Sequence, residues 1–130
     1  MNPPPPPAPR SKNLLVDDHQ IVLNGVRAIL ARTDDLCLIG SCQSPLLVED
    51  FLRQHTPDLI LMDISMGESN GLLATRRLHT DFPHIPILIF TSHDEQICAS
   101  VAESVGAKGL VMKDQPEQEI LLAIRTVLQG

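Results

Sequence analysis

Five residues in this sequence have side chains suited to phosphoryl chemistry, and each follows a short apolar run. They are Asp17, Asp18, Asp63, Thr91 and Lys113. Carboxylates that lie close together repel one another unless a cation neutralises them, and a cluster of oxygen ligands suits Mg²⁺ or Mn²⁺. A carboxylate such as Asp63 can attack phosphorus and form an aspartyl phosphate. Lys113 would supply a compact positive charge to the phosphoryl oxygens, and Thr91 a hydroxyl donor.

Alternating strands and helices are expected to bring these residues together. In the run 58–63, four apolar residues lie between two acids, which is typical of a strand buried on both faces of a parallel sheet. Strands joined by helical crossovers pair in parallel, so we expect an α/β fold, a doubly wound three-layer α/β/α sandwich. Ligands of such sheets bind at the carboxyl ends of the strands. The expected strands are 14–16, 36–42, 58–63, 86–90 and 108–112, and the expected helices are 20–32, 45–55, 70–79, 94–105 and 115–128.

Local signals mark the ends of several expected helices. Ser44 is a suitable N-cap with proline at the first helical position, and Gly106 is the residue type expected just past a helix end. The segment 114–117 resembles a capping box. The leucines of the third helix, Leu73 among them, are expected to face the sheet. His19 adjoins the acid pair, but because the other ligands are hard oxygens we expect an exposed residue at a helix start rather than a ligand.

Composition limits the classes of function. The chain has 130 residues, 43% hydrophobic and 20% charged, which fits one domain with one core. A net charge of −6 with ten Lys plus Arg argues against direct nucleic-acid contact by this domain, since phosphate backbones require clustered cations. No apolar run reaches the roughly 18 residues of a membrane span, and the N-terminus lacks signal-peptide features. We therefore expect no membrane contact and a cytoplasmic location.

Residues 1–12 hold six of the eleven prolines and are expected to form a disordered, proline-rich leader. The folded domain is expected to span 13–129. The cysteines, Cys37, Cys42 and Cys98, lack the spacing of a zinc or redox site. We interpret them as small apolar residues in a reducing compartment.

Several motifs together resemble the receiver domain of two-component response regulators. They are Leu15-Val16-Asp17-Asp18, Asp63-Ile64-Ser65-Met66 with Gly71 eight residues after Asp63, Thr91, and Gly106-Ala107-Lys108-Gly109 leading to Lys113. The resemblance covers about 13–129. It implies a flavodoxin-like, five-stranded parallel sheet of order 2-1-3-4-5.

The resemblance also implies roles for these residues. Asp63 would be phosphorylated by a sensor histidine kinase in a Mg²⁺-dependent reaction. Asp18 would bind the ion directly, and Asp17 would bind it directly or through water. The main-chain carbonyl of Ser65 would be a further ligand from the protein. The remaining two, Thr91 and Lys113, would hold the phosphoryl oxygens. Such a domain catalyses its own phosphorylation and dephosphorylation but is not a turnover enzyme, and a homodimer is possible.

The segment 17–27, together with Lys113-Asp114, is similar to receivers of the LuxR type. These usually precede a helix-turn-helix domain that binds DNA and controls transcription. No such domain follows within the 130 residues, so we expect either a receiver cut from a longer protein or a stand-alone one.

Three positions depart from the family pattern. One is Asp114, which follows Lys113 where many receivers have proline, although receivers of the LuxR type often have Asp there. Gly67 stands where proline usually follows the methionine, and Leu110 occupies the usual place of an aromatic switch residue. We hypothesise that Leu110 weakens the coupling between the phosphorylated site and the outer surface.

Three other functions are less consistent with the candidate site residues. A phosphatase acting through an aspartyl phosphate would need a second acid two residues after Asp63, where this sequence has Ser65. A nucleotide-binding module would need a glycine-rich phosphate loop, which the sequence lacks, and a receiver that serves only as a binding module is disfavoured by the intact acids.

Overall fold

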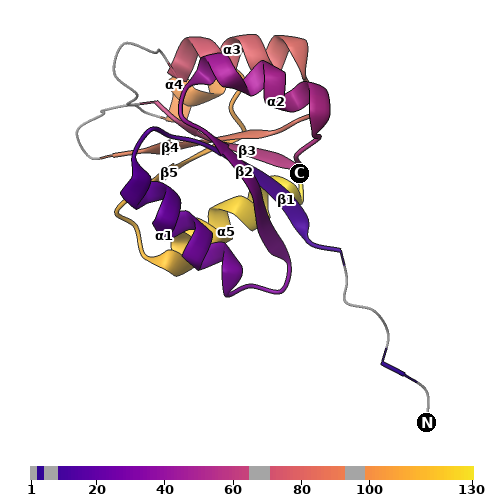
Figure 1. Ribbon diagram of the computed structural model, residues 1–130. Helices are drawn as coiled ribbons and strands as arrows, with labels where there is room; N and C mark the ends of the chain where they lie inside the picture. The colour runs from indigo at the N-terminus through magenta and orange to yellow at the C-terminus, as the bar shows by residue number, and fades with distance from the viewer. Residues whose placement is uncertain (1–2, 5–8, 65–70, 93–98) are drawn as a thin grey trace.

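The computed structural model describes residues 3–4, 9–64, 71–92 and 99–130. Its strands form one all-parallel sheet of order β2-β1-β3-β4-β5, which confirms the expected order 2-1-3-4-5. Helices α1 and α5 cover one face, and α2, α3 and α4 cover the other (Figure 1). The elements are β1 Ser11–Val16, α1 Gln20–Ala31, β2 Leu36–Cys42, η1 Pro45–Leu47, α2 Val48–Gln54, β3 Leu59–Asp63, α3 Gly71–Asp81, β4 Ile87–Thr91, α4 Ala99–Ser104, β5 Gly109–Met112 and α5 Glu117–Leu128.

Successive residues of the two central strands face opposite helical layers. Leu15 and Leu61 belong to the core between the sheet and α1 and α5. Their neighbours Val16 and Met62 belong to the core beneath α2 and α3. All four side chains are fully buried. Since both faces of β1 and β3 are apolar and buried, polar side chains are confined to the strand ends, and the acids that end or follow these strands lie at the edge of the sheet.

The structure differs from the sequence-based expectation at several element boundaries. Strand β1 begins at Ser11, inside the expected leader, because 11–13 pair with the start of β2. The expected capping box at 114–117 is wrong. Helix α5 starts at Glu117 after Pro116, with no side-chain cap, and proline disfavours a helical conformation in the residue before it. Leu78 faces the sheet as expected, but Leu73 is 58% exposed and faces away from it, because the helical period turns the side with Gly71, Thr75 and Leu78 inward.

Other local predictions are confirmed. Ser44 caps the turn η1, and its side chain accepts a hydrogen bond from the backbone N–H of Leu46 at 3.2 Å. Burial raises the pKa of the Cys42 thiol, which fits its interpretation as a small apolar core residue. Cys98 lies outside the described residues.

Among the described residues, no helix is both long enough and apolar enough to cross a membrane.

Gly106 ends α4 as expected, in the left-handed region with φ 97°. The N–H of Gly106 donates to the carbonyl oxygen of Glu103 at 2.9 Å. The N–H of Ala107 donates to the carbonyl oxygen of Ala102 at 3.1 Å. This pair of bonds is a Schellman motif, which satisfies carbonyl groups at the end of a helix. A Cβ atom on Gly106 would lie 2.4 Å from Cγ of His79.

We expect Gly106→Ala to lower the free energy of unfolding by about 2 kcal/mol, because the new side chain meets both an unfavourable φ and the ring of His79. Urea unfolding followed by circular dichroism measures the change, since the chain has no Trp or Tyr to report by fluorescence. Gly25→Ala is the matched control. Gly25 lies in α1 with open space around its Cα, so that substitution should stabilise by about 0.5–1 kcal/mol. Equal effects at the two glycines would contradict this explanation.

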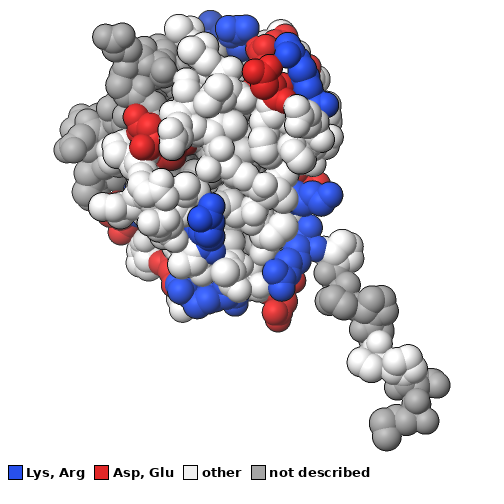
Figure 2. Space-filling view, viewed as in Figure 1, with Lys and Arg blue, Asp and Glu red and all other residues white. Residues whose placement is uncertain are grey.

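Two arginine–carboxylate pairs hold the ends of α5. At its start, Glu117 Oε2 lies 2.6 Å from a terminal guanidinium nitrogen of Arg32. In its last turn, Arg125 makes two hydrogen bonds of 2.9 Å to the carboxylate of Asp35, just before β2. These hydrogen bonds lower the pKa of Asp35 below its ordinary value. Figure 2 shows that Lys and Arg are interspersed with Asp and Glu on the face drawn there.

The lowered pKa of Asp35 predicts a pH dependence of stability. A carboxylate whose pKa falls on folding stabilises the folded state above its unfolded pKa, near 4, and this contribution is lost as the pH falls through the folded pKa. Because the Asp35 side chain is 53% exposed, we expect Asp35→Asn to cost at most about 1 kcal/mol near pH 7 and almost nothing near pH 3. Thermal unfolding at both pH values measures the difference. Asp50→Asn, which removes an exposed pair within α2, should have a smaller effect at pH 7.

Candidate functional site

The site lies at the carboxyl edge of the sheet, where the two central strands end. Asp17 directly follows β1, and its N–H donates to the carbonyl oxygen of Cys42 at 2.9 Å. Asp63 is the last residue of β3. Both carboxylates have no exposed side-chain surface. Since buried carboxylates are stable only with a compensating charge, this edge requires a cation.

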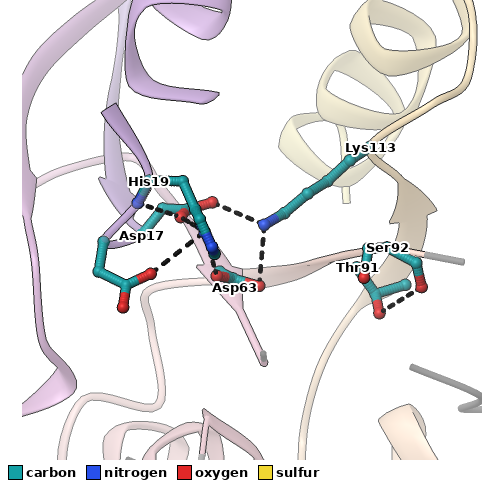
Figure 3. Close-up of polar contacts among 7 residues, drawn as sticks. Asp17, His19, Asp63, Thr91, Ser92 and Lys113 are labelled. Atoms are coloured by element: carbon teal, nitrogen blue, oxygen red, sulfur yellow. Dashed lines mark hydrogen bonds and ion pairs between the residues drawn. The ribbon is translucent and has the colours of Figure 1, made fainter. Parts of the chain in front are cut away.

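Lys113 supplies one such positive charge from the end of β5, an edge strand of the sheet. It directly follows β5, and its backbone N–H donates to the carbonyl oxygen of Thr91 at 2.7 Å. Its Nζ lies 2.9 Å from Asp17 Oδ2 and 3.1 Å from Asp63 Oδ1 (Figure 3). The lysine side chain is 13% exposed. The structure thus brings together three of the residues that the sequence placed at one edge.

Asp18 and His19 complete the cluster. Asp18 is about half exposed, and its Oδ1 lies 3.1 Å from His19 Nδ1. The same nitrogen lies 2.8 Å from Asp17 Oδ1 and 3.8 Å from Asp63 Oδ2. His19 is the N-cap of α1 and half exposed, as expected for a helix start. Its ring also folds back over the carboxylates, so it belongs to the cluster of possible ligands (Figure 3).

The donor set fits a hard divalent cation. One ligand atom from each of Asp17, Asp18, His19 and Asp63 lies within 4.8 Å of all the others. Three carboxylates in this arrangement suit Mg²⁺ or Mn²⁺, whose preferred ligands are oxygens. Ser65, the fourth expected ligand, lies outside the described residues.

Thr91 lies at the end of β4 and is buried, but it is separated from the carboxylates (Figure 3). Its Oγ1 lies 3.4 Å from the carbonyl oxygen of Ser92. The sequence predicts the strand end correctly. The direction of a single hydroxyl depends on local packing, which the sequence does not show.

Gly71 packs directly against the nucleophile candidate. It is the first residue of α3, and a Cβ atom built on it would lie 2.6 Å from the carbonyl oxygen of Asp63 and 2.7 Å from Cα of Ile64. Both atoms belong to the backbone and have little freedom to move. Any larger residue at position 71 must therefore displace the end of β3.

The geometry agrees with a known family. Residues 14–125 match the response regulator receiver domain. This chain is a response-regulator receiver domain. Oxygen regulatory protein NreC from Staphylococcus epidermidis is 35% identical to the receiver over 121 residues, which are 92% of this chain and 55% of that protein. The NreC of Staphylococcus haemolyticus is 36% identical with the same coverage.

Solved structures give the same assignment. A LuxR-family two-component response regulator from Aurantimonas sp. SI85-9A1 is 31% identical, with a TM-score of 0.85 and coverage of 94% of this chain and 87% of that chain. The NarL receiver domain from Mycobacterium tuberculosis, 23% identical with a TM-score of 0.83, has the same fold. The expected LuxR-type character is therefore confirmed. The receiver spans about half the length of the curated relatives it matches.

Of the three departures from the family pattern, Leu110 and Asp114 fall in the described part of the chain, and Asp114 is exposed. Leu110 lies on β5 and packs, partly buried, against the small core of Ile89, Ala102 and Ala107 beneath α4. Its effect on switching stays a hypothesis. Gly67 lies outside the described residues.

Proposed function

We propose that this receiver accepts a phosphoryl group on Asp63 from a sensor histidine kinase, in a reaction that needs Mg²⁺ or Mn²⁺, and then controls an output. The observation that supports this most is the contact of one ammonium group with two buried carboxylates, at 2.9 and 3.1 Å. Such an arrangement concentrates a nucleophile, a cation site and a phosphoryl-binding charge at one point. We place this reaction in the cytoplasm.

Each residue has a defined role in the proposed transfer. An oxygen of the Asp63 carboxylate attacks phosphorus, the bond from phosphorus to the donor breaks, and the donor leaves with the bonding electron pair. Lys113, now in contact with Asp63 Oδ1, moves its contact to a phosphoryl oxygen. Asp17, Asp18, Asp63 and the Ser65 carbonyl would hold the divalent cation, which neutralises the charge that collects at the site. The same site would release the phosphate slowly to water, without the turnover of an enzyme.

Phosphorylation is proposed to shift the receiver between two packings. An aspartyl phosphate adds a charge of roughly −1.5 to −2. Taking an active form from about 1% to 99% requires the phosphate to favour it by about 5.5 kcal/mol. The proposed source of this free energy is the new contacts that Lys113 makes with the phosphate, together with those of Thr91 once its hydroxyl turns toward it. The output is proposed to be transcription, through a helix-turn-helix domain outside these 130 residues.

The test is phosphorylation by a small donor. Incubation with acetyl phosphate and Mg²⁺ should attach one acid-stable, base-labile phosphoryl group per chain, measured by intact-mass spectrometry. Asp63→Asn should abolish the addition, because an amide does not attack phosphorus at a useful rate. Asp34→Asn, an exposed acid before β2, is the control and should be phosphorylated normally. Absence of any addition would contradict the proposal and favour a pure binding module, and continuous release of phosphate over many turnovers would favour a phosphatase.

A further inference from the structure

The two buried carboxylates of the site present their oxygens in two directions. Asp17 Oδ2 and Asp63 Oδ1 face Lys113, at 2.9 and 3.1 Å. The other oxygen of each faces His19, with Asp17 Oδ1 at 2.8 Å and Asp63 Oδ2 at 3.8 Å from Nδ1. The lysine therefore occupies one side of the carboxylate pair and the imidazole the other (Figure 3).

The imidazole is held in this place by the local backbone. The N–H of His19 donates to Asp17 Oδ1 at 2.9 Å, so the residue turns back toward the acid that precedes it. Asp18 Oδ1, at 3.1 Å from Nδ1, joins the group from the solvent side. Because the His19 side chain is 53% exposed, ions and water can reach this side of the cluster. One oxygen from each of three carboxylates thus lies within 3.8 Å of Nδ1, and ligand atoms of the four residues lie within 4.8 Å of one another.

We propose that Nδ1 of His19 is a direct ligand of the divalent cation in this receiver. The inference rests on the proposed function, because it assumes that a cation binds the three acids. A set of three carboxylates and one imidazole differs from an all-oxygen set in its selectivity. Nitrogen ligands favour the later first-row metals, while Mg²⁺ gains little from them. His19 should therefore raise the affinity of this site for later first-row metals while leaving its affinity for Mg²⁺ nearly unchanged.

Direct ligation differs from a simple hydrogen bond in where the proton lies. As a ligand, Nδ1 uses its lone pair, and the proton of the neutral ring is on Nε2. As a hydrogen-bond donor to the carboxylates, Nδ1 carries a proton and cannot bind a metal. Only the first arrangement couples the nitrogen nucleus to the unpaired electrons of a bound paramagnetic ion.

The experiment uses the full chain without a histidine tag, loaded with Mn²⁺. Electron spin-echo envelope modulation should show coupling to a directly bound ¹⁴N nucleus, and His19→Gln should remove it. In calorimetric titrations, His19→Gln should weaken Ni²⁺ binding by at least about 10–100-fold, because losing a partner that only supports a ligand already has an effect of this size. Binding of Mg²⁺ should change by less than about threefold. His84→Gln, an exposed histidine before β4, is the control and should change neither result.

The results separate the inference from the proposed function. If Mn²⁺ binds and Asp63 takes up phosphate, but no ¹⁴N coupling is seen, His19 is not a ligand and only this inference fails. An equal loss of Ni²⁺ and Mg²⁺ affinity in His19→Gln would also overturn it, because it would indicate a structural role. If no divalent ion binds and no phosphate is taken up, the proposed function fails as well.

Discussion

Replacing Lys113 with glutamine is expected to lower the free energy of unfolding of the metal-free chain by about 3–5 kcal/mol. The substitution leaves Asp17 and Asp63 buried with no side-chain exposure, and it removes the ammonium that lies about 3 Å from both. Removing one partner of a buried ion pair is costly because the remaining charge keeps its desolvation penalty. Urea unfolding in the presence of EDTA measures the effect.

Divalent cations should partly reverse this loss. Without the lysine, the carboxylates repel one another more strongly, so a bound cation should stabilise Lys113→Gln more than the unchanged chain. Unfolding with and without Mg²⁺ gives both values. Lys108→Gln, which removes an exposed lysine just before β5, is the control and should change stability by less than about 0.5 kcal/mol. A Lys113→Gln chain as stable as the unchanged one would show that the two carboxylates do not depend on this charge.

Gly71→Ala is expected to slow phosphoryl uptake by about 100-fold, since a displacement of about 1 Å at a reacting group has an effect of this size. The added methyl group would lie 2.6 Å from the carbonyl oxygen of Asp63 and 2.7 Å from Cα of Ile64. Neither backbone atom can move without shifting the end of β3. The initial rate of acetyl phosphate uptake measures the change.

Gly40→Ala is the control for a close contact away from the site. Its Cβ would lie 2.7 Å from the ring of Phe51, so β2 or that side chain must adjust. This substitution should reduce stability while leaving the rate of uptake nearly unchanged. If Gly71→Ala and Gly40→Ala reduce the rate equally, the contact between Gly71 and Asp63 is not what positions the nucleophile.

The strand order could be predicted because the motifs resemble those of receiver domains, and the edge position of Asp63 because it depends on residue types alone. Four buried apolar residues ending in an acid place that acid at the end of the strand, and β3 has its expected place at the centre of the sheet. The approach of Lys113 to Asp17 and Asp63 follows from the same topology, since the parallel strands direct their ends to one edge.

The details that the sequence did not predict depend on packing between distant segments. His19 has its expected place as a half-exposed residue at a helix start, but the sequence does not show that its Nδ1 lies within 3.8 Å of an oxygen of each of the three carboxylates. Strand β1 starts early because its first residues pair with β2. Ser11 pairs with Leu36, which lies 25 residues later in the sequence. The helix start at Glu117 differs because Pro116 ends the preceding turn. A side-chain direction or a pairing partner is not encoded in any single segment.

The unequal anchoring of the helices bears on how this receiver can move. Arg32 and Arg125 fasten α5 at its two ends, to the end of α1 and to the start of β2. In the described part of the chain, α4 contributes only Ala102 to the buried core, in a cluster with Ile89 and Ala107. Helix α5 also places Ile120 and Ile124 in the large buried core, whereas α4 packs on a few small side chains, so we expect α4 to shift at a lower free-energy cost than α5. Conformational change in this domain should therefore be easiest at α4, on the face of the sheet opposite α1 and α5 (Figure 1).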